Sequence, residues 1–330
     1  MTSSDINKVL IAGYDYPDTY REFVEMFPDN IACAAFMEKL RWPNGFICPR
    51  CNVASKPWYQ TRNRLVCPHC RFQTSVCAGT IFEKTRTPLI TWFEAAWHVT
   101  TAKNGLSAKT LERTLGTTYR VAWAMLQRFR IAMVRSEREL LSGVIEVDET
   151  FVGGVGLGSK RGRGTDKCII AVAVEVKSPK GFGRVRLRYI PDASGDNLIS
   201  FVSDSVLPGS TIHTDGWNGY NRLSEAGYHH IKTIQSESES THVSMKGVHR
   251  IAALLKRWIL GTHQGSITSE HLQSYLEEYT FRFNRRASSS RGLVFYRLIE
   301  QSVNANQITE ADLIHGYNWD EHDSKSSRRS

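Results

Sequence analysis

Apolar residues recur at helical spacing between residues 87 and 134, and the pattern predicts a group of helices there. The three helices are expected at 87–105, 107–115 and 117–134. Gly105 fits the C-cap of the first, Ser107 the N-cap of the second, and Gly116 the turn before the third. A helix, a glycine turn and a longer helix form the layout of a helix-turn-helix.

After Arg138 the pattern changes to short runs of β-branched and other apolar residues, which predict buried strands. The four runs span 143–154, 168–176, 184–192 and 210–215. We expect the first three to be antiparallel neighbours, and the segment 195–206 before the fourth to be a helix. Three strands, a helix and a further strand match the order of an RNase H-like core. The expected fold class is therefore α/β, with a mixed sheet flanked by helices.

Three more helices are expected after the last strand, and they span 245–261, 268–286 and 290–303. In the first of them, Val248, Ile251, Leu255 and Trp258 form a buried stripe. The second is expected to cover the core. The polar tail 321–330 is expected to be disordered.

Composition favours a globular protein with a polyanionic partner. The 330 residues are 41% apolar and 23% charged, which is ordinary for a globular chain. The net charge of +9 favours nucleic acid as a partner before a membrane surface. No apolar run approaches the roughly 20 residues that span a bilayer, and the N-terminus lacks the features of a signal peptide. We therefore expect a cytoplasmic chain, associated with the nucleoid when bound to DNA, whose cysteines bind metal or stay free.

Four of the seven cysteines stand in two C-x₂-C pairs. Cys48 and Cys51 form the first pair, Cys67 and Cys70 the second, and fifteen residues separate them. This spacing matches a zinc pattern, with four unrelated thiols as the alternative. Each pair aims two thiolates at one ion, and two pairs complete a closed tetrahedron. The expected zinc is therefore structural.

Two aspartates stand at the ends of predicted strands. Asp148 lies in GVIEVDET and Asp215 in STIHTDGWNGY, each after a β-branched run. Two aspartates brought together at neighbouring strand ends form a site for a divalent metal. In a basic chain, the natural reaction of such a site is phosphodiester cleavage or transfer.

A third ligand is expected on the helix 245–261. His249 can ligate a metal through a neutral imidazole. Lys256 lies two turns further along an adjacent face, where it can hold a phosphate or orient DNA. The alternative is a helix histidine without a ligand role. Rival third ligands are Glu237, Glu239 and His242, in a stretch that reads as a loop.

Basic residues in three segments are candidates for DNA contact. From Lys84 to Ser136 there are nine Lys or Arg against two Glu, with a solvated basic face as the alternative reading. The glycine-rich, basic segment 155–167 predicts a loop beside a phosphate backbone, and it lacks the ending of a Walker A loop. The candidates are Arg120, Arg128 and Arg130 in the helical segment, Lys160, Arg161 and Arg163 in the loop, and Arg282, Arg285 and Arg286 in the helix 268–286.

The motifs together carry a family resemblance. CPRC and CPHC are followed by VDETFVGG, HTDGWNGY, LLKRWILGTHQG and YTFRFNRR. Over most of its length the chain resembles the bacterial insertion-sequence transposases of the DDE type that have an N-terminal zinc ribbon and an RNase H-like catalytic domain, the ISXO-type group. The resemblance implies that Asp148 and Asp215 are the first two catalytic acids. It also implies that His249 takes the third position and that Lys256 is the basic residue seven places on.

Five parts are then expected along the chain. They are an N-terminal helical segment at 1–40, a zinc ribbon at 41–82, a helix-turn-helix region at 83–138, the RNase H-like catalytic domain at 139–305 and a partly disordered tail at 306–330.

The third catalytic position departs from the general pattern of the family, which has a glutamate there. Variants with Asn or His occur within this group. A neutral ligand leaves a second metal ion with less compensating charge, so we expect weaker binding of that ion, or help from Glu146 or Glu149. By strand alternation Glu146 points to the same side as Asp148, and it is the better of the two.

The resemblance implies a DNA transposase that cuts phosphodiester bonds at transposon ends with Mg²⁺ or Mn²⁺ and joins the 3′-hydroxyl to target DNA. The implied partners are terminal inverted repeats, a target duplex and further copies of the chain, at least a dimer. Three alternatives stay open. They are a zinc-ribbon and helix-turn-helix regulator without catalysis, an inactive or domesticated transposase, and a metal-dependent nuclease without strand transfer.

Overall fold

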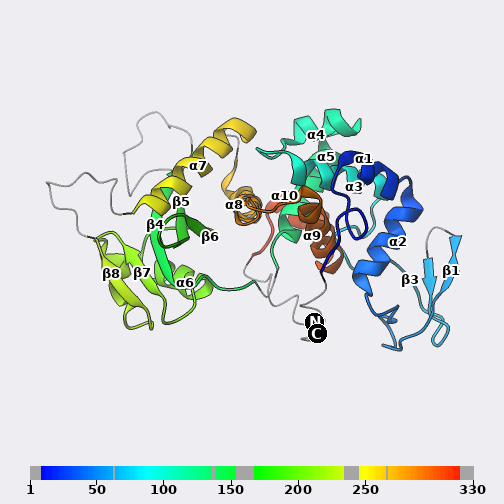
Figure 1. The fold of residues 1–330 in the computed structure, drawn as a ribbon, viewed down its shortest axis with the longest axis horizontal. Helices are drawn as coiled ribbons and strands as arrows, with labels where there is room; N and C mark the ends of the chain where they lie inside the picture. Colours follow the sequence, from blue (N-terminus) through cyan, green and yellow to red (C-terminus); the bar gives the residue numbers. More distant parts are fainter. Residues whose placement is uncertain are drawn as a thin grey trace. The chain divides into compact units, whose positions relative to one another are not determined.

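The chain divides into two compact units in the computed structural model, which describes residues 9–61, 64–135, 138–153, 167–233, 245–264 and 267–319. One unit spans Glu137–Arg286. The other joins Met1–Ser136 with Ala287–Ser330. Figure 1 shows both units as ribbons coloured along the sequence.

A mixed sheet forms the centre of the unit Glu137–Arg286. Its strands are β4 (Val144–Val152), β5 (Cys168–Val176), β6 (Phe182–Ile190), β7 (Thr211–Thr214) and β8 (His229–Lys232). The strand order is β6-β5-β4-β7-β8; β4, β5 and β6 pair antiparallel, while β7 runs parallel to β4 and β8 parallel to β7. The four expected strands and the α/β class are confirmed. β8 is an addition, because its short sequence HHIK lacks the alternation that predicts a strand.

Helices cover both faces of this sheet. They are α6 (Gly195–Ser205) and the 3₁₀-helix η3 (Asn218–Leu223) on one face, and α7 (Lys246–His263) and α8 (Ser269–Asn284) on the other. In Figure 1, α6 and α7 lie on opposite sides of β4 and β5. On β4, Ile145 and Val147 pack toward α6, whereas on β5, Val172 and Val174 pack toward α7. Alternation along each strand therefore serves two separate apolar cores.

Helices dominate the second unit. They are α1 (Tyr20–Met26), α2 (Asn30–Arg41), α3 (Leu89–Thr101), α4 (Ala108–Leu115), α5 (Tyr119–Ala132), α9 (Arg291–Asn304) and α10 (Glu310–His315). Phe295 of α9 joins several of them, since its ring centroid lies 5.6 Å from that of Phe23 and 5.8 Å from those of Phe93 and Trp97. The sequence places 290–303 at the end of the catalytic domain, but α9 packs with these N-terminal helices. The buried ring of Phe295, which packs against these helices, is the physical reason for this placement of α9.

The helix pair α4 and α5 has the capped ends that the sequence predicts. Ser107 Oγ accepts a hydrogen bond from the Thr110 N–H at 3.1 Å, at the start of α4. Gly116 ends α4 with a left-handed φ of 63°, which glycine adopts without steric cost. Two helices joined by a glycine turn are therefore present.

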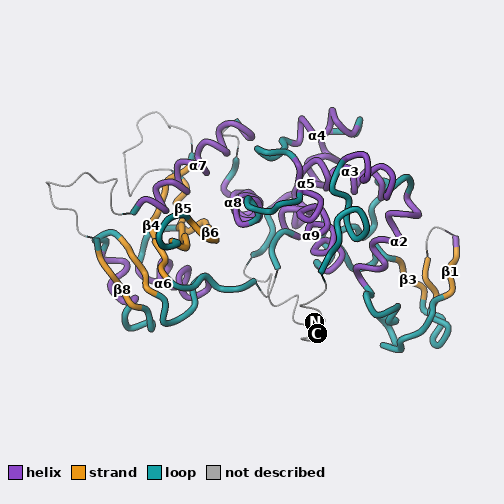
Figure 2. The backbone as a smooth tube through the Cα atoms, in the orientation of Figure 1, coloured by secondary structure: helices purple, strands orange, loops and turns teal. Residues whose placement is uncertain are grey.

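A small three-stranded meander follows α2 in the chain. It consists of β1 (Trp58–Gln60), β2 (Arg64–Val66) and β3 (Gln73–Ser75), paired antiparallel. Figure 2 shows these strands as short orange segments among loops. The Arg41 guanidinium of α2 donates to the carbonyls of Ser75 and Val76 at 3.1 and 2.9 Å, which ties the meander to α2.

Candidate active site and zinc site

The four cysteines of the two C-x₂-C pairs converge beside the meander. Their sulfur atoms all lie within 4.8 Å of one another. Cys48 Sγ is 3.6 Å from Cys70 Sγ, and Cys51 Sγ is 3.7 Å from Cys67 Sγ. A tetrahedron of Zn–S bonds of ~2.3 Å has sulfur atoms about 3.8 Å apart, so the donors fit zinc.

Both cysteine pairs sit in the same kind of backbone turn. The Asn52 N–H donates to the Cys48 carbonyl at 2.9 Å, and the Arg71 N–H donates to the Cys67 carbonyl at 3.0 Å. Asn52 and Arg71 both take a left-handed φ, of 54° and 60°. In each pair the left-handed residue directly follows the second cysteine. The sequence repeat therefore produces a structural repeat around one point.

The two strand-end aspartates lie on neighbouring strands. β4 and β7 run parallel with Glu146 opposite His213, and counting two residues along each strand places Asp148 beside Asp215. Asp148 Oδ1 accepts the Glu149 N–H at 2.8 Å, and Asp215 Oδ1 accepts the Trp217 N–H at 3.0 Å. The parallel pairing of β4 and β7 therefore brings together carboxylates that are far apart in the sequence.

His249 reaches Asp148 from the first turn of α7. Its Nδ1 lies 4.0 Å from Asp148 Oδ2, which is longer than a hydrogen bond. The imidazole is 43% exposed and the Asp148 side chain 21%, so both remain accessible to a ligand. Within the described ranges, the four cysteines form the one group with three or more ligand atoms inside 4.8 Å. The Asp148, Asp215 and His249 atoms are more widely spread.

Glu146 holds the start of α7 against the sheet. Its buried carboxylate accepts the N–H groups of Gly247 and Val248 at 2.7 and 3.0 Å through Oε2. Met245, at the N-cap of α7, makes no side-chain cap bond, so Glu146 supplies the missing acceptor from a strand. A carboxylate also complements the positive end of the helix dipole.

The contact needs a glycine at position 247. A Cβ there would lie 2.8 Å from Glu146 Oε2 and 2.9 Å from Val174 Cγ1. A larger residue would force the Glu146 side chain, the Val174 side chain or the start of α7 to shift. Glu146 does point to the same face as Asp148, as alternation predicts, but its Oε2 is engaged in capping α7.

Glu149 lies on the opposite face of β4, near η3. It contributes to raising the pKa of the buried Tyr220 phenol well above its ordinary value; burial is the first cause, followed by the charges of Glu149, Asp148 and Asp215. Tyr220 is fully buried. Tyr220 was not predicted as a site residue, although its place five residues after Asp215 in HTDGWNGY was a signal. Three carboxylates therefore lie within electrostatic range of one buried phenol at this strand end.

Lys256 lies two turns beyond His249 on α7. Burial, followed by the charge of Lys167, lowers the pKa of its ammonium, while Asp148 raises it. Asp148 is therefore within electrostatic reach of Lys256. A positive charge there is suited to holding a phosphate near Asp148.

The arginines proposed for DNA contact in α5 differ in exposure. Arg120 is exposed and forms an ion pair with Glu310 of α10. Arg128 is half-buried, and burial lowers its pKa. Arg130 is 2% exposed, so its side chain lies within the folded unit, and we leave it out of the proposed DNA surface.

Other candidates lie elsewhere in the catalytic unit. Arg282 and Arg285 are half-buried at the end of α8, and the Arg285 guanidinium lies 3.9 Å from the ring centroid of Phe281. The candidates Lys160, Arg161 and Arg163 and the rival ligands Glu237, Glu239 and His242 lie outside the described residues.

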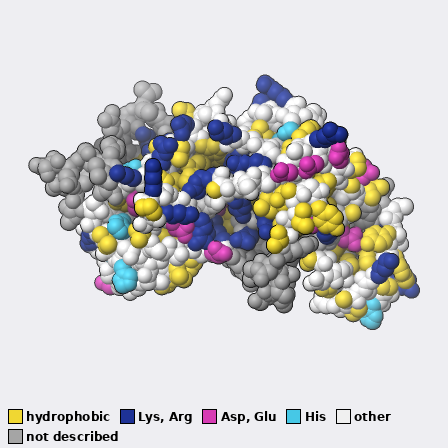
Figure 3. All heavy atoms as spheres, viewed as in Figure 1, with side chains coloured by type: hydrophobic (Ala, Val, Ile, Leu, Met, Phe, Trp, Pro, Cys, Tyr) yellow, Lys and Arg dark blue, Asp and Glu magenta, His cyan; other side chains and the backbone are white. Residues whose placement is uncertain are grey.

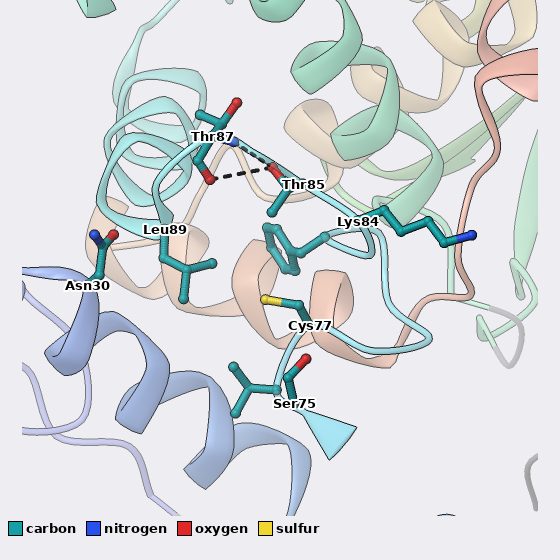
Figure 4. A pocket seen from close by; sticks show the side chains of 9 residues that line it. Asn30, Ser75, Cys77, Lys84, Thr85, Thr87 and Leu89 are labelled. Atoms are coloured by element: carbon teal, nitrogen blue, oxygen red, sulfur yellow. Dashed lines mark hydrogen bonds between the residues drawn. The ribbon is translucent and has the colours of Figure 1, made fainter. Parts of the chain in front are cut away.

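A pocket of about 330 Å³ lies between α2, the meander and the start of α3. Figure 4 shows Cys77, Lys84, Thr85 and Leu89 around it. Burial raises the pKa of the Cys77 thiol to about 11, so the thiol stays neutral. The lining residues include no carboxylate or histidine, and the pocket has no evident reaction chemistry.

Comparisons with known proteins identify both regions. Residues 140–284 match the ISXO2-like transposase domain, and residues 28–76 match the transposase zinc-ribbon domain. The chain is 26% identical over 282 residues to an uncharacterized protein in transposable element ISH50 of Halobacterium salinarum, covering 78% of this chain and 92% of that protein. It is 24% identical over 115 residues to an uncharacterized transposase-like protein of Haemophilus influenzae, covering 34% of this chain and 92% of that protein.

Among solved structures, the catalytic core domain of BIV integrase aligns with 42% of this chain and 82% of its own, at 21% identity and a TM-score of 0.27. The two domain matches confirm the resemblance to insertion-sequence transposases with a zinc ribbon. Within the described part of the chain, every helix is too short or too polar to traverse a bilayer.

Proposed function

We propose that this chain, a DNA transposase with an ISXO2-like domain and a zinc ribbon, cuts DNA at the ends of its element and joins them to a target duplex. Asp148, Asp215 and His249 would hold divalent Mg²⁺ or Mn²⁺ for this reaction. The observation that carries the proposal is the docking of α7, which places His249 Nδ1 4.0 Å from Asp148 Oδ2. The pairing of β4 with β7 adds Asp215 beside Asp148.

Each residue has a role that its surroundings support. When bound, a divalent ion supplies a Lewis acid for the phosphate and lowers the pKa of a bound water. The N–H groups of Glu149 and Trp217 fix the two aspartate carboxylates in place. Lys256 supplies positive charge for the phosphate. A neutral imidazole gives this ligand set two negative charges instead of three, so ion binding is weaker than with a glutamate.

The DNA partners follow from the helical unit and the net charge. The α4–α5 pair has the layout of a helix-turn-helix, and its basic candidates are the exposed Arg120 and the half-buried Arg128. These would contact terminal inverted repeats. Two ends must be cut and joined together, so we propose that at least two copies of the chain act on DNA.

A second candidate function is DNA binding without cleavage. It is favoured by histidine at the third position and by the spread of the three ligand atoms. The two functions separate in one assay, which follows a labelled duplex of a transposon end through cleavage and joining with Mg²⁺ or Mn²⁺. Wild type is compared with His249→Ala and His249→Glu.

Metal-dependent joining by wild type, lost in His249→Ala, is the expected result. Activity confined to His249→Glu would instead identify a DNA-binding protein that has lost its catalytic ligand. Full activity in His249→Ala would remove His249 from the site.

A further inference from the structure

Four arginines of the catalytic unit are paired with carboxylates. Arg138 pairs with Glu277, Arg184 with Glu175, Arg188 with Asp204 and Arg222 with Asp196. In each pair a nearby carboxylate offsets the charge of the arginine. These four arginines contrast with others that have no carboxylate partner in the described part of the chain.

Three arginines on α7 and at the end of α8 differ from these four in their lack of a carboxylate partner among the described residues. Within the described residues, Arg250, Arg257 and Arg286 form no ion pair with any carboxylate; we call them the arginine cluster. Arg286 donates instead to the backbone carbonyls of Phe283, Gly183 and Phe182. All three residues are exposed. In the part of the chain that the structure describes, no carboxylate pairs with these three exposed charges.

Helix geometry places Arg250 and Arg257 on a different flank of α7 from the catalytic candidates. Each residue turns the helix by about 100°, so Arg250 and Arg257 follow His249 and Lys256 around the axis, away from Asp148. Both pairs are seven residues apart, and each therefore forms a stripe along α7. Figure 3 shows Lys and Arg side chains gathered along α7 in this view.

Tyr279 of α8 lies within electrostatic range of all three members of the arginine cluster. Its ring lies 5.7 Å from Trp258 of α7 and 6.0 Å from Phe283, and the Arg286 guanidinium lies 3.9 Å from the Phe283 centroid. The Tyr279 hydroxyl is buried and finds no hydrogen-bond partner among the described residues. Burial raises the pKa of Tyr279, and the charges of Arg286, Arg257 and Arg250 all lower it. These charges therefore act on one region of the α7–α8 surface.

We infer that the arginine cluster binds the phosphate backbone of DNA, on the flank of α7 that lies about 100° around the helix axis from the catalytic candidates. Like charges gathered without a counter-charge repel one another, and a polyanion removes that cost. Arg250 and Arg257 are about 10.5 Å apart along the helix, close to the rise of three base pairs at about 3.4 Å each. Guanidinium groups also suit phosphates because they donate two parallel hydrogen bonds.

The inference rests on the proposed action on DNA, but it can be tested without catalysis. The experiment is a titration of zinc-loaded protein against a labelled transposon-end duplex and an unrelated duplex, by fluorescence anisotropy over a range of salt concentrations. No Mg²⁺ or Mn²⁺ is added. The variants are Arg250→Gln/Arg257→Gln and Arg250→Lys/Arg257→Lys. The matched control is Arg188→Gln, which also removes a positive charge from this unit but from a residue paired with Asp204.

The Gln double variant should bind both duplexes more weakly, with the slope of log affinity against log salt reduced by about 1.8, or ~0.9 for each lost phosphate contact. The Lys double variant should keep most of the slope, and Arg188→Gln should leave it unchanged. Melting temperature and zinc content confirm that each variant is folded. An unchanged slope in a folded Gln variant would overturn the inference. Failure of the wild type to cut DNA would count against the proposed function alone, because binding is measured without the catalytic ion.

Discussion

The zinc site and the candidate active site both gather metal-binding side chains, yet the chain builds them differently. The four cysteines come from two repeated turns within one small meander, and their sulfur atoms already lie within 4.8 Å of one another. The candidate active site takes its residues from β4, the end of β7 and α7, and its ligand atoms are more widely spread. A closed site forms from local geometry, whereas this open site depends on how a helix docks against a sheet.

The largest effect is expected from breaking the zinc site. Cys48→Ser removes one of four thiolates, and zinc binding in such small domains contributes about 10–16 kcal/mol of folding free energy. Zinc measured by atomic absorption should fall from one ion per chain to near zero, and the meander should become sensitive to protease. Cys168→Ser, a thiol outside the cluster, is the control. Full zinc retention in Cys48→Ser would remove Cys48 from the ligand set.

An aspartate change should abolish catalysis without unfolding the chain. Asp148→Asn or Asp215→Asn should reduce cleavage on the order of a thousandfold, comparable to the loss of a major electrostatic contact at a reaction centre. Binding to a transposon-end duplex and zinc content should stay as in wild type. The control is Asp204→Asn, a surface carboxylate paired with Arg188. Normal cleavage by either aspartate variant would refute the metal-site assignment.

A smaller effect tests whether helix docking completes the open site. Glu146→Ala leaves the N–H groups of Gly247 and Val248 without their acceptor, at a cost of about 1–3 kcal/mol in the free energy of unfolding. It should also raise the Mn²⁺ concentration for half-maximal cleavage by roughly 10–100-fold, as loss of a supporting contact to a ligand does. Glu146→Gln keeps one acceptor oxygen and should fall between Ala and wild type.

The control for Glu146 is another helix cap. Ser107→Ala removes the side-chain cap of α4 and should lower stability by about 1 kcal/mol. It should not change the Mn²⁺ requirement. If Glu146→Ala lowers the melting temperature but leaves the Mn²⁺ requirement as in wild type, Glu146 has a structural role only.

Sequence patterns predicted much of this molecule because many of its signals are local. The two C-x₂-C pairs, the cap at Ser107 and the glycine turn at Gly116 each depend on a few adjacent residues. The β-branched runs predicted β4 to β7 because buried strands need such side chains on alternating or both faces.

What the sequence did not predict depends on contacts between distant segments. Glu146 caps a helix one hundred residues further on, and the need for a small residue at Gly247 follows from that contact. The packing of α9 with the N-terminal helices depends on the pocket that Phe23 and Trp97 form around Phe295. Arg130 was predicted to be an exposed basic residue of the helix 117–134, yet it is buried. Local spacing gives no information about such partners.

The most direct test of the account is a Mn²⁺ soak of zinc-loaded crystals, with anomalous scattering measured at the manganese edge. We expect manganese beside Asp148 and Asp215, with the His249 imidazole as a ligand and α7 held by Glu146. Manganese bound without His249, or bound at Glu149 on the other face of β4, would contradict it.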